Sequence, residues 1–480
     1  MLINSNFIKR TIFPTMAMIG LLFLFACGTD APASQVTEGE NVNTEGTTPI
    51  NTIPNPGDPS KYFVLAWLAD CVNDKIMVIS PESAVHDSTI AVQNEAHGFI
   101  QGAISNGSLQ KIIGQQSLAD GWGPVVRLEP TWTTPYYAVS NLMYCLKSTD
   151  QESGDLHYTV GISGTDAIST FDWFTEDLAV DTLSTWPQGG KVSNGSLRGY
   201  NILKDLINER GASLLVFLQN EVLSNPGKSI SVSVTGHSLG GAMTQVYSSY
   251  IRANLDSQVN VKAWVYAGPT AGNQLFASNL VRQLSGQYYA YNNKLDAIPH
   301  AWASSQLNEL CGLYDGKKAC TDGIVIGANP LINGVIKYLR NISASGQYTM
   351  PPGQLTRFDS PKDYYIECKD LDTFSSKLKS TFSTELGRIV SNCSNRTITD
   401  NDYQTFASYF TEMGLQHTSA YLDHFVQDTA QQNIISEYFY HLNAQDKTIN
   451  EEAAGIVLEF FIMNASSLPL KDCDCSTTSN

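Results

Sequence analysis

The middle of the chain alternates between two patterns of apolar residues. Ser229–Thr235 and Val261–Ala267 are short apolar runs of the kind that form strands. Ala242–Ile251, Gln274–Leu284 and the longer Leu197–Leu223 carry apolar residues at helical spacing instead. Because strands that alternate with helices build a parallel sheet covered on both faces, we predict an α/β fold with a mainly parallel central sheet flanked by helices.

The regions on either side differ from this pattern. Thr134–Lys147 and Leu156–Ser163 are β-rich runs joined by a turn-forming segment, which predicts a hairpin. At about residues 306–411 the alternation stops, and four cysteines and four prolines predict an insertion or cap subdomain within a folded domain spanning 61–480. A helical pattern over Ile434–Phe461 is expected to close the fold.

Residues 1–26 have the pattern of a targeting segment. Lys9 and Arg10 precede an apolar run, Ile12–Ala26, that is too short to span a bilayer comfortably. The run ends at Cys27 in a setting that resembles a bacterial lipoprotein signal, whose cysteine is lipidated and becomes the mature N-terminus. We therefore predict an exported lipoprotein anchored through Cys27 to a membrane of the bacterial cell envelope or surface. An ordinary cleaved signal, giving a secreted protein, is the alternative.

Residues 27–60 are predicted to be a flexible tether. From Gly28 to Ser60 there are five prolines, five acidic residues and neither an aromatic nor a basic residue, which is too little apolar surface to fold. The whole chain is 42% hydrophobic and 16% charged, a globular balance. Its net charge of −17 would repel nucleic acid and no basic cluster offsets this charge, so we expect no nucleic-acid partner.

Eight cysteines follow Cys27, and an even set in an exported protein favours disulfides over a metal site. The spacing of Cys311 to Cys320 and of Cys368 to Cys393 allows local bridges, although the sequence leaves the pairing open. The eight are Cys71, Cys145, Cys311, Cys320, Cys368, Cys393, Cys473 and Cys475.

The chemistry of the chain is indicated by the motif Gly236-His237-Ser238-Leu239-Gly240. It stands between a predicted strand and a predicted helix, which is the setting of a nucleophile elbow: the glycines let the backbone turn sharply and expose the serine hydroxyl. The start of the helix adds a partial positive charge near a developing oxyanion. The alternative is a glycine-rich turn with an incidental serine.

A serine nucleophile needs a base, and the base needs an acid to orient it. Asp296 follows the strand-like Gln287–Asn293, at the sheet edge where ligand sites gather in open α/β sheets, and it is the candidate acid. Its alternative role is to cap a turn before Pro299.

Four histidines follow the candidate acid. His300 is expected to share its loop, and His441 lies among the aromatic residues of a predicted helix. His417 follows Gly414 at a transition from loop to helix and is the favoured base. His424, seven residues further on and near the same helical face, is the alternative.

These motifs resemble the fungal-type, class 3 lipase family of α/β-hydrolases. The resemblance implies Ser238, Asp296 and His417 as a catalytic triad, with Thr165 and the backbone N–H of Leu239 forming the oxyanion hole. Ser163, Ser193 and Thr270 replace an arginine, a histidine and a second arginine of the family pattern. The similar segments are Ile162-Ser163-Gly164-Thr165, Asp172-Trp173, Asp177-Leu178, Lys191 to Gly195, Gly236 to Gly241, Gly268 to Asn273 and Asp296-Ala297-Ile298-Pro299.

The resemblance predicts a serine hydrolase that cleaves carboxylic esters of lipids or acylglycerols and needs neither a metal nor an organic cofactor. A phospholipase or an acyltransferase would use the same triad, because the triad fixes the reaction type and the pocket fixes the substrate. A surface-binding lipoprotein with an inactive hydrolase fold is the alternative from a different class.

Overall fold

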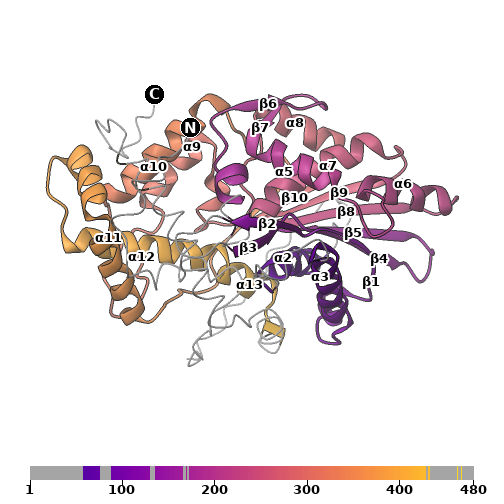
Figure 1. Cartoon of the computed structure of the whole chain (residues 1–480), viewed down its shortest axis with the longest axis horizontal. Helices are drawn as coiled ribbons and strands as arrows, with labels where there is room; N and C mark the ends of the chain where they lie inside the picture. Colours follow the sequence, from indigo (N-terminus) through magenta and orange to yellow (C-terminus); the bar gives the residue numbers. More distant parts are fainter. Residues whose placement is uncertain are drawn as a thin grey trace, which may run out of the picture.

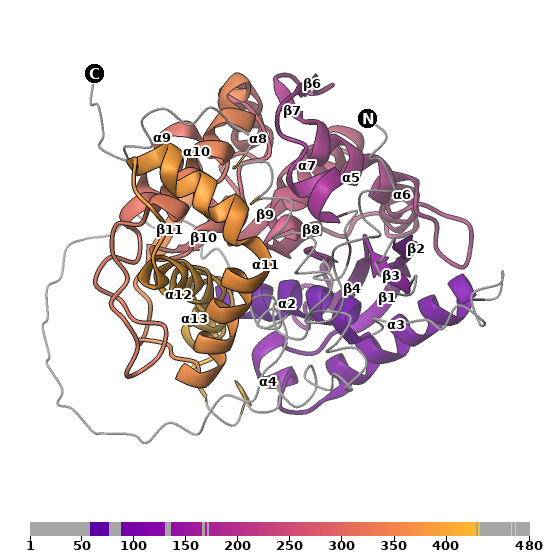
Figure 2. The same ribbon diagram turned by 60° about the vertical axis from the view of Figure 1, so that its left-hand side comes forward.

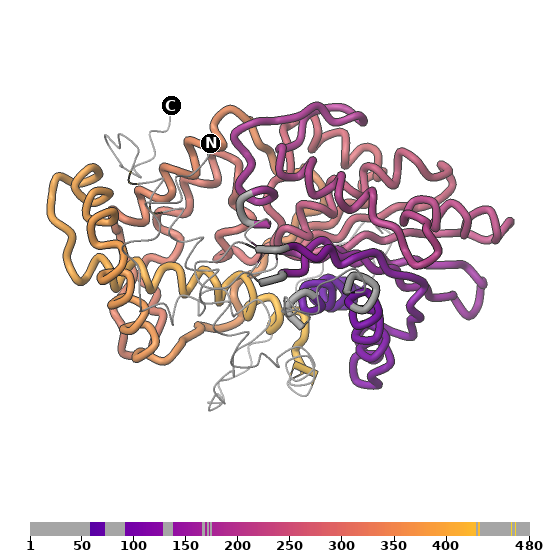
Figure 3. The backbone as a smooth tube through the Cα atoms, in the orientation of Figure 1, coloured from indigo at the N-terminus to yellow at the C-terminus, as the bar shows by residue number. Residues whose placement is uncertain are grey.

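The structure is a computed structural model that describes residues 58–75, 88–129, 136–165, 169, 172–428, 431–432, 462 and 466. The tube in Figure 3 follows these residues in colour. The predicted signal at 1–26, Cys27, nearly all of the predicted tether, the predicted helix Ile434–Phe461, Cys473 and Cys475 lie outside them. No helix within the described part is long and apolar enough to cross a membrane.

A seven-stranded sheet forms the centre of the described part, in the order β1-β4-β5-β8-β9-β10-β11. β1 and β4 pair antiparallel, as do β4 and β5, whereas all pairs from β5 to β11 are parallel. The mainly parallel sheet and the β4–β5 hairpin confirm the prediction. The strands are β1 (Ser117–Trp122), β4 (Met143–Thr149), β5 (Leu156–Ile162), β8 (Ile230–His237), β9 (Asn260–Tyr266), β10 (Tyr288–Asn293) and β11 (Gln354–Phe358).

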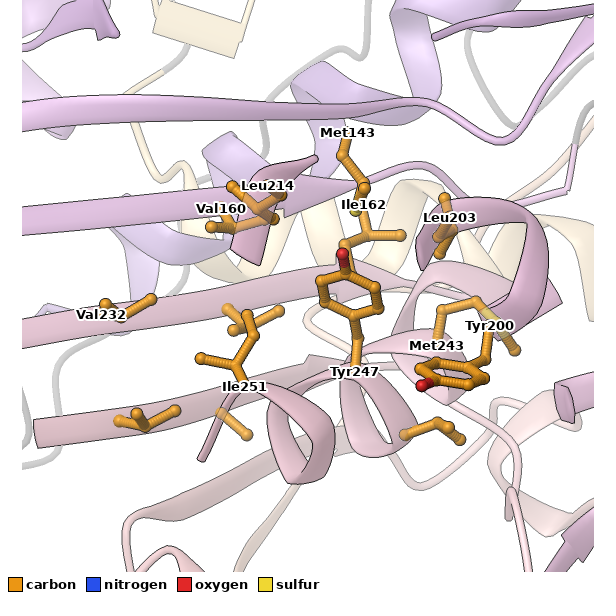
Figure 4. Packing of buried hydrophobic residues seen from close by; sticks show 14 of the residues in the cluster. Met143, Val160, Ile162, Tyr200, Leu203, Leu214, Val232, Met243, Tyr247 and Ile251 are labelled. Atoms are coloured by element: carbon orange, nitrogen blue, oxygen red, sulfur yellow. The ribbon is translucent and has the colours of Figure 1, made fainter. Parts of the chain in front are cut away.

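Helices cover both faces of this sheet (Figure 1). On one face, Val160 and Val232 pack with Met243 and Tyr247 in one apolar cluster (Figure 4). Val234 belongs to the same cluster. The helices of this face are α5 (Asn194–Asp205), α6 (Leu214–Ser224), α7 (Leu239–Asn254) and α8 (Gln274–Gln283). The sequence pattern over Leu197–Leu223 therefore comprises two helices. They are separated by a turn in which Asn208 Oδ1 accepts the N–H groups of Arg210 and Ala212.

The opposite face carries α2 (Pro59–Lys75), α3 (Ser88–Ser105) and α13 (Ser419–Phe425). Trp264 and Tyr266 of β9 pack here with Phe63 of α2. The polar positions of β8 also face α2, because Ser233 and Thr235 both bond to Tyr62. Helix α2 is therefore part of the layer that covers this face of the sheet. Smaller elements are α4 (Gln110–Ile113), β2 (Val125–Glu129), β3 (Tyr136–Ser140), β6 (Leu183–Thr185), β7 (Lys191–Ser193) and the π-helix η2 (Asp172–Asp177).

A third apolar cluster is formed by the helices after β10, which lie together beside the sheet (Figure 2). They are α9 (Ser304–Leu307), α10 (Pro330–Ser343), α11 (Cys368–Ser394) and α12 (Asp400–His417), with the short 3-10 helices Ile298–His300, Glu309–Gly312 and Ala344–Gly346. The segment 306–411 is not wholly outside the sheet, since β11 pairs parallel with β10. Only Phe358 of β11 is buried, so this edge strand lacks the apolar alternation that marks the inner strands.

The cysteines differ from the prediction in two ways. Cys320 is bonded to Cys368, so neither local pairing suggested by the spacing forms. Cys71, Cys311 and Cys393 are also in disulfides. Cys145, however, is a free, buried thiol on β4, and the loss of hydration on burial raises its pKa. Spacing could not reveal this, because an inward-facing strand cysteine packs like any small apolar residue.

Candidate active site

Ser238 stands at the junction of β8 and α7. It has φ 56° and ψ −126°, a conformation that a residue with a side chain rarely adopts. Its backbone is fixed on both sides: Ser238 N–H donates to Tyr266 O at 3.0 Å, and Ser238 O accepts the N–H of Gly241 at 2.9 Å. The strained turn is therefore built at the serine itself.

Gly236 and Gly240 serve a different purpose from the one that the motif suggests. Their own φ angles are not in the left-handed region. A Cβ at Gly236 would collide with Gly240 O, and a Cβ at Gly240 would collide with Ile162 O. The two glycines allow close approach between β5, β8 and α7, which brings the start of α7 against the end of β5.

The structure brings Ser238, His417 and Asp296 together from three elements. His417, the last residue of α12, has Nε2 3.0 Å from Ser238 Oγ. Its Nδ1 lies 2.9 Å from Asp296 Oδ2 and 3.0 Å from Asp296 Oδ1. Asp296, just past β10, is fully buried, whereas the His417 side chain is 15% exposed. This is the spatial order of a nucleophile, a base and an orienting acid.

Asp296 is held by two further donors. Ile298 N–H donates to Oδ1, and the Tyr421 hydroxyl donates to Oδ2, each at 2.9 Å. Tyr421 is itself fixed because its oxygen accepts the N–H of Asn293. These hydrogen bonds fix the position of the Asp296 carboxylate beside His417.

The other histidines lie elsewhere. His424 stacks on Phe358 with ring centroids 3.8 Å apart, and burial lowers its pKa. Thr418 has a non-helical conformation, so His424 is on α13 and does not continue the face of α12. His300 Nδ1 lies 3.4 Å from Glu309, and His441 is outside the described residues.

Leu239 and Thr165 are the two residues expected at an oxyanion hole, and Leu239 directly follows Ser238 in the chain. Leu239 is the first residue of α7, a position whose N–H has no partner inside its helix. The Thr165 hydroxyl donates to Asp177 Oδ2 at 2.7 Å. Loss of hydration raises the pKa of the half-buried Asp177 to about 7, and burial has the same effect on the neighbouring Glu176. Thr165 therefore has a carboxylate partner that titrates near neutral pH.

His237, the residue before the serine, is buried and bonded on both ring nitrogens. Nδ1 lies 2.9 Å from Asp70 Oδ2, and Nε2 lies 3.0 Å from His417 O. Sequence reasoning missed Asp70, which is far from every recognised motif. Its signal was an acidic residue inside the otherwise apolar helical run that includes Trp67 and Val72. Within the described residues, no group of three or more His, Cys, Asp or Glu side chains is arranged to hold a metal ion.

Part of the chain is similar in sequence to known lipases. Residues 159–305 match the sequence model of the family described as "Lipase (class 3)". The chain is 31% identical over 113 residues to the secreted mono- and diacylglycerol lipase MDL2 of Malassezia globosa, covering 24% of this chain and 34% of that protein. It is 28% identical over 153 residues to MDL3 of the same organism, covering 31% and 47%. The chain thus spans a third to a half of these relatives.

A solved structure shows the fold over more of the chain. The crystal structure of M37 lipase superimposes with a TM-score of 0.55 at 17% identity, covering 80% of this chain and 96% of that one. Together with the sheet order, this likeness defines the fold as that of an α/β-hydrolase. Within it, residues 159–305 are the part that matches the class 3 lipase model.

Proposed function

We propose that this protein is a serine hydrolase that cleaves carboxylic esters, most directly those of lipids or acylglycerols. The observation that supports the proposal is the position of the His417 imidazole between Ser238 and Asp296. Its Nε2 is 3.0 Å from Ser238 Oγ, and its Nδ1 is 2.9 Å from Asp296 Oδ2. This geometry gives a hydroxyl a proton acceptor whose tautomer and orientation are already set.

The reaction follows from these contacts. Ser238 Oγ attacks the ester carbonyl carbon while its proton passes to His417 Nε2. His417 then returns that proton to the oxygen of the departing alcohol, and the acyl group stays on Ser238. A water molecule gives a proton to Nε2 and attacks the acyl carbon, after which the proton returns to Ser238 and the carboxylic acid leaves. Asp296 stabilises the imidazolium formed in each half of the reaction.

The developing negative charge on the carbonyl oxygen needs donors. The N–H of Leu239 points from the start of α7, where the helix dipole also favours an anion. The Thr165 hydroxyl is the second proposed donor. Thr165 follows Gly164 just after β5, whose end the glycine contacts hold against the start of α7.

Lipid esters are the favoured substrates because the matched segment is that of class 3 lipases and the curated relatives are named mono- and diacylglycerol lipases. A phospholipase, an acyltransferase on the same triad and an inactive surface-binding lipoprotein remain as outcomes of the test. A panel of soluble and emulsified esters, varied in acyl chain and head group, separates the enzymatic outcomes.

Labelling with a fluorophosphonate probe separates an enzyme from an inactive fold. The wild-type protein is expected to be labelled, and Ser238→Ala is expected to fold without being labelled. Ser257→Ala, on the same chain but outside the site, is the matched control and is expected to be labelled like the wild type. A folded wild-type protein that resists the probe would overturn the proposal.

We further propose that the protein is exported and anchored by a lipid on Cys27, with residues 27–60 as the tether of the catalytic part. The basic and apolar pattern before Cys27 supports export, and the relatives are named as secreted proteins. An anchored enzyme would act on esters close to the membrane that holds it. A cleaved, secreted form is the alternative.

A further inference from the structure

Asp70 lies on α2, the first helix of the described residues, yet it contacts two parts of the candidate active site. Its Oδ1 accepts the N–H of Gly164, the residue before Thr165. Its Oδ2 faces His237 Nδ1 at 2.9 Å, next to Ser238. These partners are 94 and 167 positions away in sequence, and α2 packs directly beneath β5 and β8 (Figure 1).

His237 extends this contact to the base. Its Nε2 lies 3.0 Å from the carbonyl oxygen of His417, and the two imidazole rings are 4.7 Å apart. A carbonyl oxygen only accepts, so Nε2 of His237 donates to it, and the hydrogen bond between Nδ1 and Asp70 Oδ2 requires a second proton between these two atoms. The ring of Trp67, one turn before Asp70, packs at an angle against the His237 ring, with the ring centroids 5.0 Å apart.

We propose that Asp70 is a positioning residue that fixes the oxyanion-hole segment, the nucleophile elbow and the backbone of the base relative to one another. The inference rests on the proposed hydrolase function and adds a residue from outside the class 3 lipase segment. Asp70 contacts Gly164 of the oxyanion-hole segment and His237 of the elbow directly, and it reaches His417 through His237.

The packing leaves little freedom for this arrangement to shift. A Cβ at Gly164 would lie 3.0 Å from Asp70 Oδ1 and 2.9 Å from His237 O. The Asp70 carboxylate therefore contacts the backbone at Gly164 so closely that a side chain at this position would collide with it. Asp70 and His237 are 9% and 2% exposed, so water does not replace either contact readily. A misplacement of about 1 Å in a reacting group costs on the order of 10² in rate. Loss of the contacts of Asp70 with Gly164 and His237 is therefore expected to reduce turnover.

The test compares two substitutions at Asp70. Asp70→Leu removes both acceptors, and we expect kcat for a soluble ester to fall by about 10²-fold with KM nearly unchanged. Asp70→Asn keeps an oxygen for Gly164 N–H and directs an N–H at His237 Nδ1, so it is expected to recover at least tenfold of that loss. The rate of fluorophosphonate labelling should follow kcat, since both need Ser238 and His417 in register.

Asp120 provides a matched control. It is also 9% exposed and also accepts one backbone N–H, from Gly121, and one side-chain N–H, from Asn208. Asp120→Leu thus removes a comparable buried carboxylate from a part of the sheet remote from Ser238. We expect it to lower the Tm while kcat stays within about threefold of wild type. All rates are measured well below each Tm, with folding checked by circular dichroism.

The outcomes are distinct. A wild-type protein that neither reacts with the probe nor turns over esters overturns the proposed function itself. An active wild type with an equally active Asp70→Leu overturns the role of Asp70 alone. Asp70→Ala, which leaves a space instead of a branched side chain, is made alongside. If neither Leu nor Ala folds while Asp120→Leu does, Asp70 acts through stability and the inference is wrong.

Discussion

The Tyr421 hydroxyl donates to Asp296 Oδ2 at 2.9 Å, and the same carboxylate oxygen lies 2.9 Å from His417 Nδ1. Tyr421 is buried four residues after the base, on the far side of the break at Thr418. The turn at the end of α12 thus places both His417 and the Tyr421 hydroxyl against the Asp296 carboxylate.

Removing this hydroxyl should weaken the orientation of the acid. For Tyr421→Phe we expect kcat to fall by about tenfold, the value of one hydrogen bond to a charged group. For Asp296→Asn we expect a fall of about 10⁴-fold, because the amide holds the wrong imidazole tautomer. Steady-state kinetics on a soluble ester measure both. Equal losses in the two variants would contradict the separate roles.

The base is assigned by a pair of histidine substitutions. His417→Ala should abolish ester turnover with the fold preserved, because Ser238 loses its proton acceptor. His424→Ala should retain turnover, since it removes only the stacking contact with Phe358. An inactive His424→Ala beside an active His417→Ala would reverse the assignment.

The partner of Thr165 predicts a pH dependence. The Thr165 hydroxyl has one proton to donate. Ionised Asp177 accepts the hydrogen bond from this hydroxyl. Protonated Asp177 can instead donate to Thr165, which leaves the hydroxyl proton of Thr165 for the oxyanion. The pKa of Asp177 is about 7. This contribution to kcat is therefore present below pH 7 and lost as the pH rises through 7.

Two variants isolate the effect. Asp177→Asn always presents an N–H to Thr165, so its kcat relative to wild type should increase between pH 6 and pH 9. Thr165→Val should lower kcat by about 10² to 10³ at pH 6, the range for one oxyanion donor. Parallel pH profiles for wild type and Asp177→Asn would rule out the coupling.

Glu412 predicts how stability changes with pH. Burial raises its pKa from 4.5 to about 7, and Gln416 donates to its Oε1 at 2.8 Å. The folded protein therefore holds a proton that the unfolded chain releases between about pH 4.5 and 7, so this group costs stability as the pH rises. Relative to Glu412→Gln, the free energy of unfolding of wild type should fall by up to about 1.4 kcal/mol per pH unit in that window. Denaturant titrations at several pH values test it, with Glu152→Gln on an exposed turn as the control.

The anchor is tested by Cys27→Ala. A lipidated Cys27 should keep the protein on washed membranes, since several acyl chains bind durably, and the substitution should release it. Membrane association that persists in the variant would count against lipidation at this residue. Cys145→Ala, which alters a buried thiol, is the matched control and should stay bound.

Local patterns were enough to predict the sheet and the elbow. The alternation of Ile230, Val232 and Val234 before Ser238 reflects burial on one face of β8, and burial is the property that a sequence displays most directly. The same rule failed for β11, where Gln354, Thr356 and Arg357 are exposed and leave no apolar signature.

Long-range partners could not be predicted in the same way. Asp70 and His237 meet only because α2 lies beneath β8, which no local spacing records. The Cys320–Cys368 bridge likewise joins residues 48 positions apart in preference to nearer neighbours. Positions such as these are determined by how layers stack, which is a property of the whole fold.

The parallel pairing of β11 with β10 also extends the sheet beyond residues 159–305, the segment that matches the class 3 lipase model. A fragment cut to residues 159–305 would keep Ser238 and Asp296 but would expose the edge of β10 to other chains. It would also lack His417 and Asp70, which come from opposite ends of the described chain. Transfer of the proposed catalytic residues to another scaffold therefore requires chain segments from both sides of residues 159–305. A design limited to that segment would be inactive and prone to aggregation.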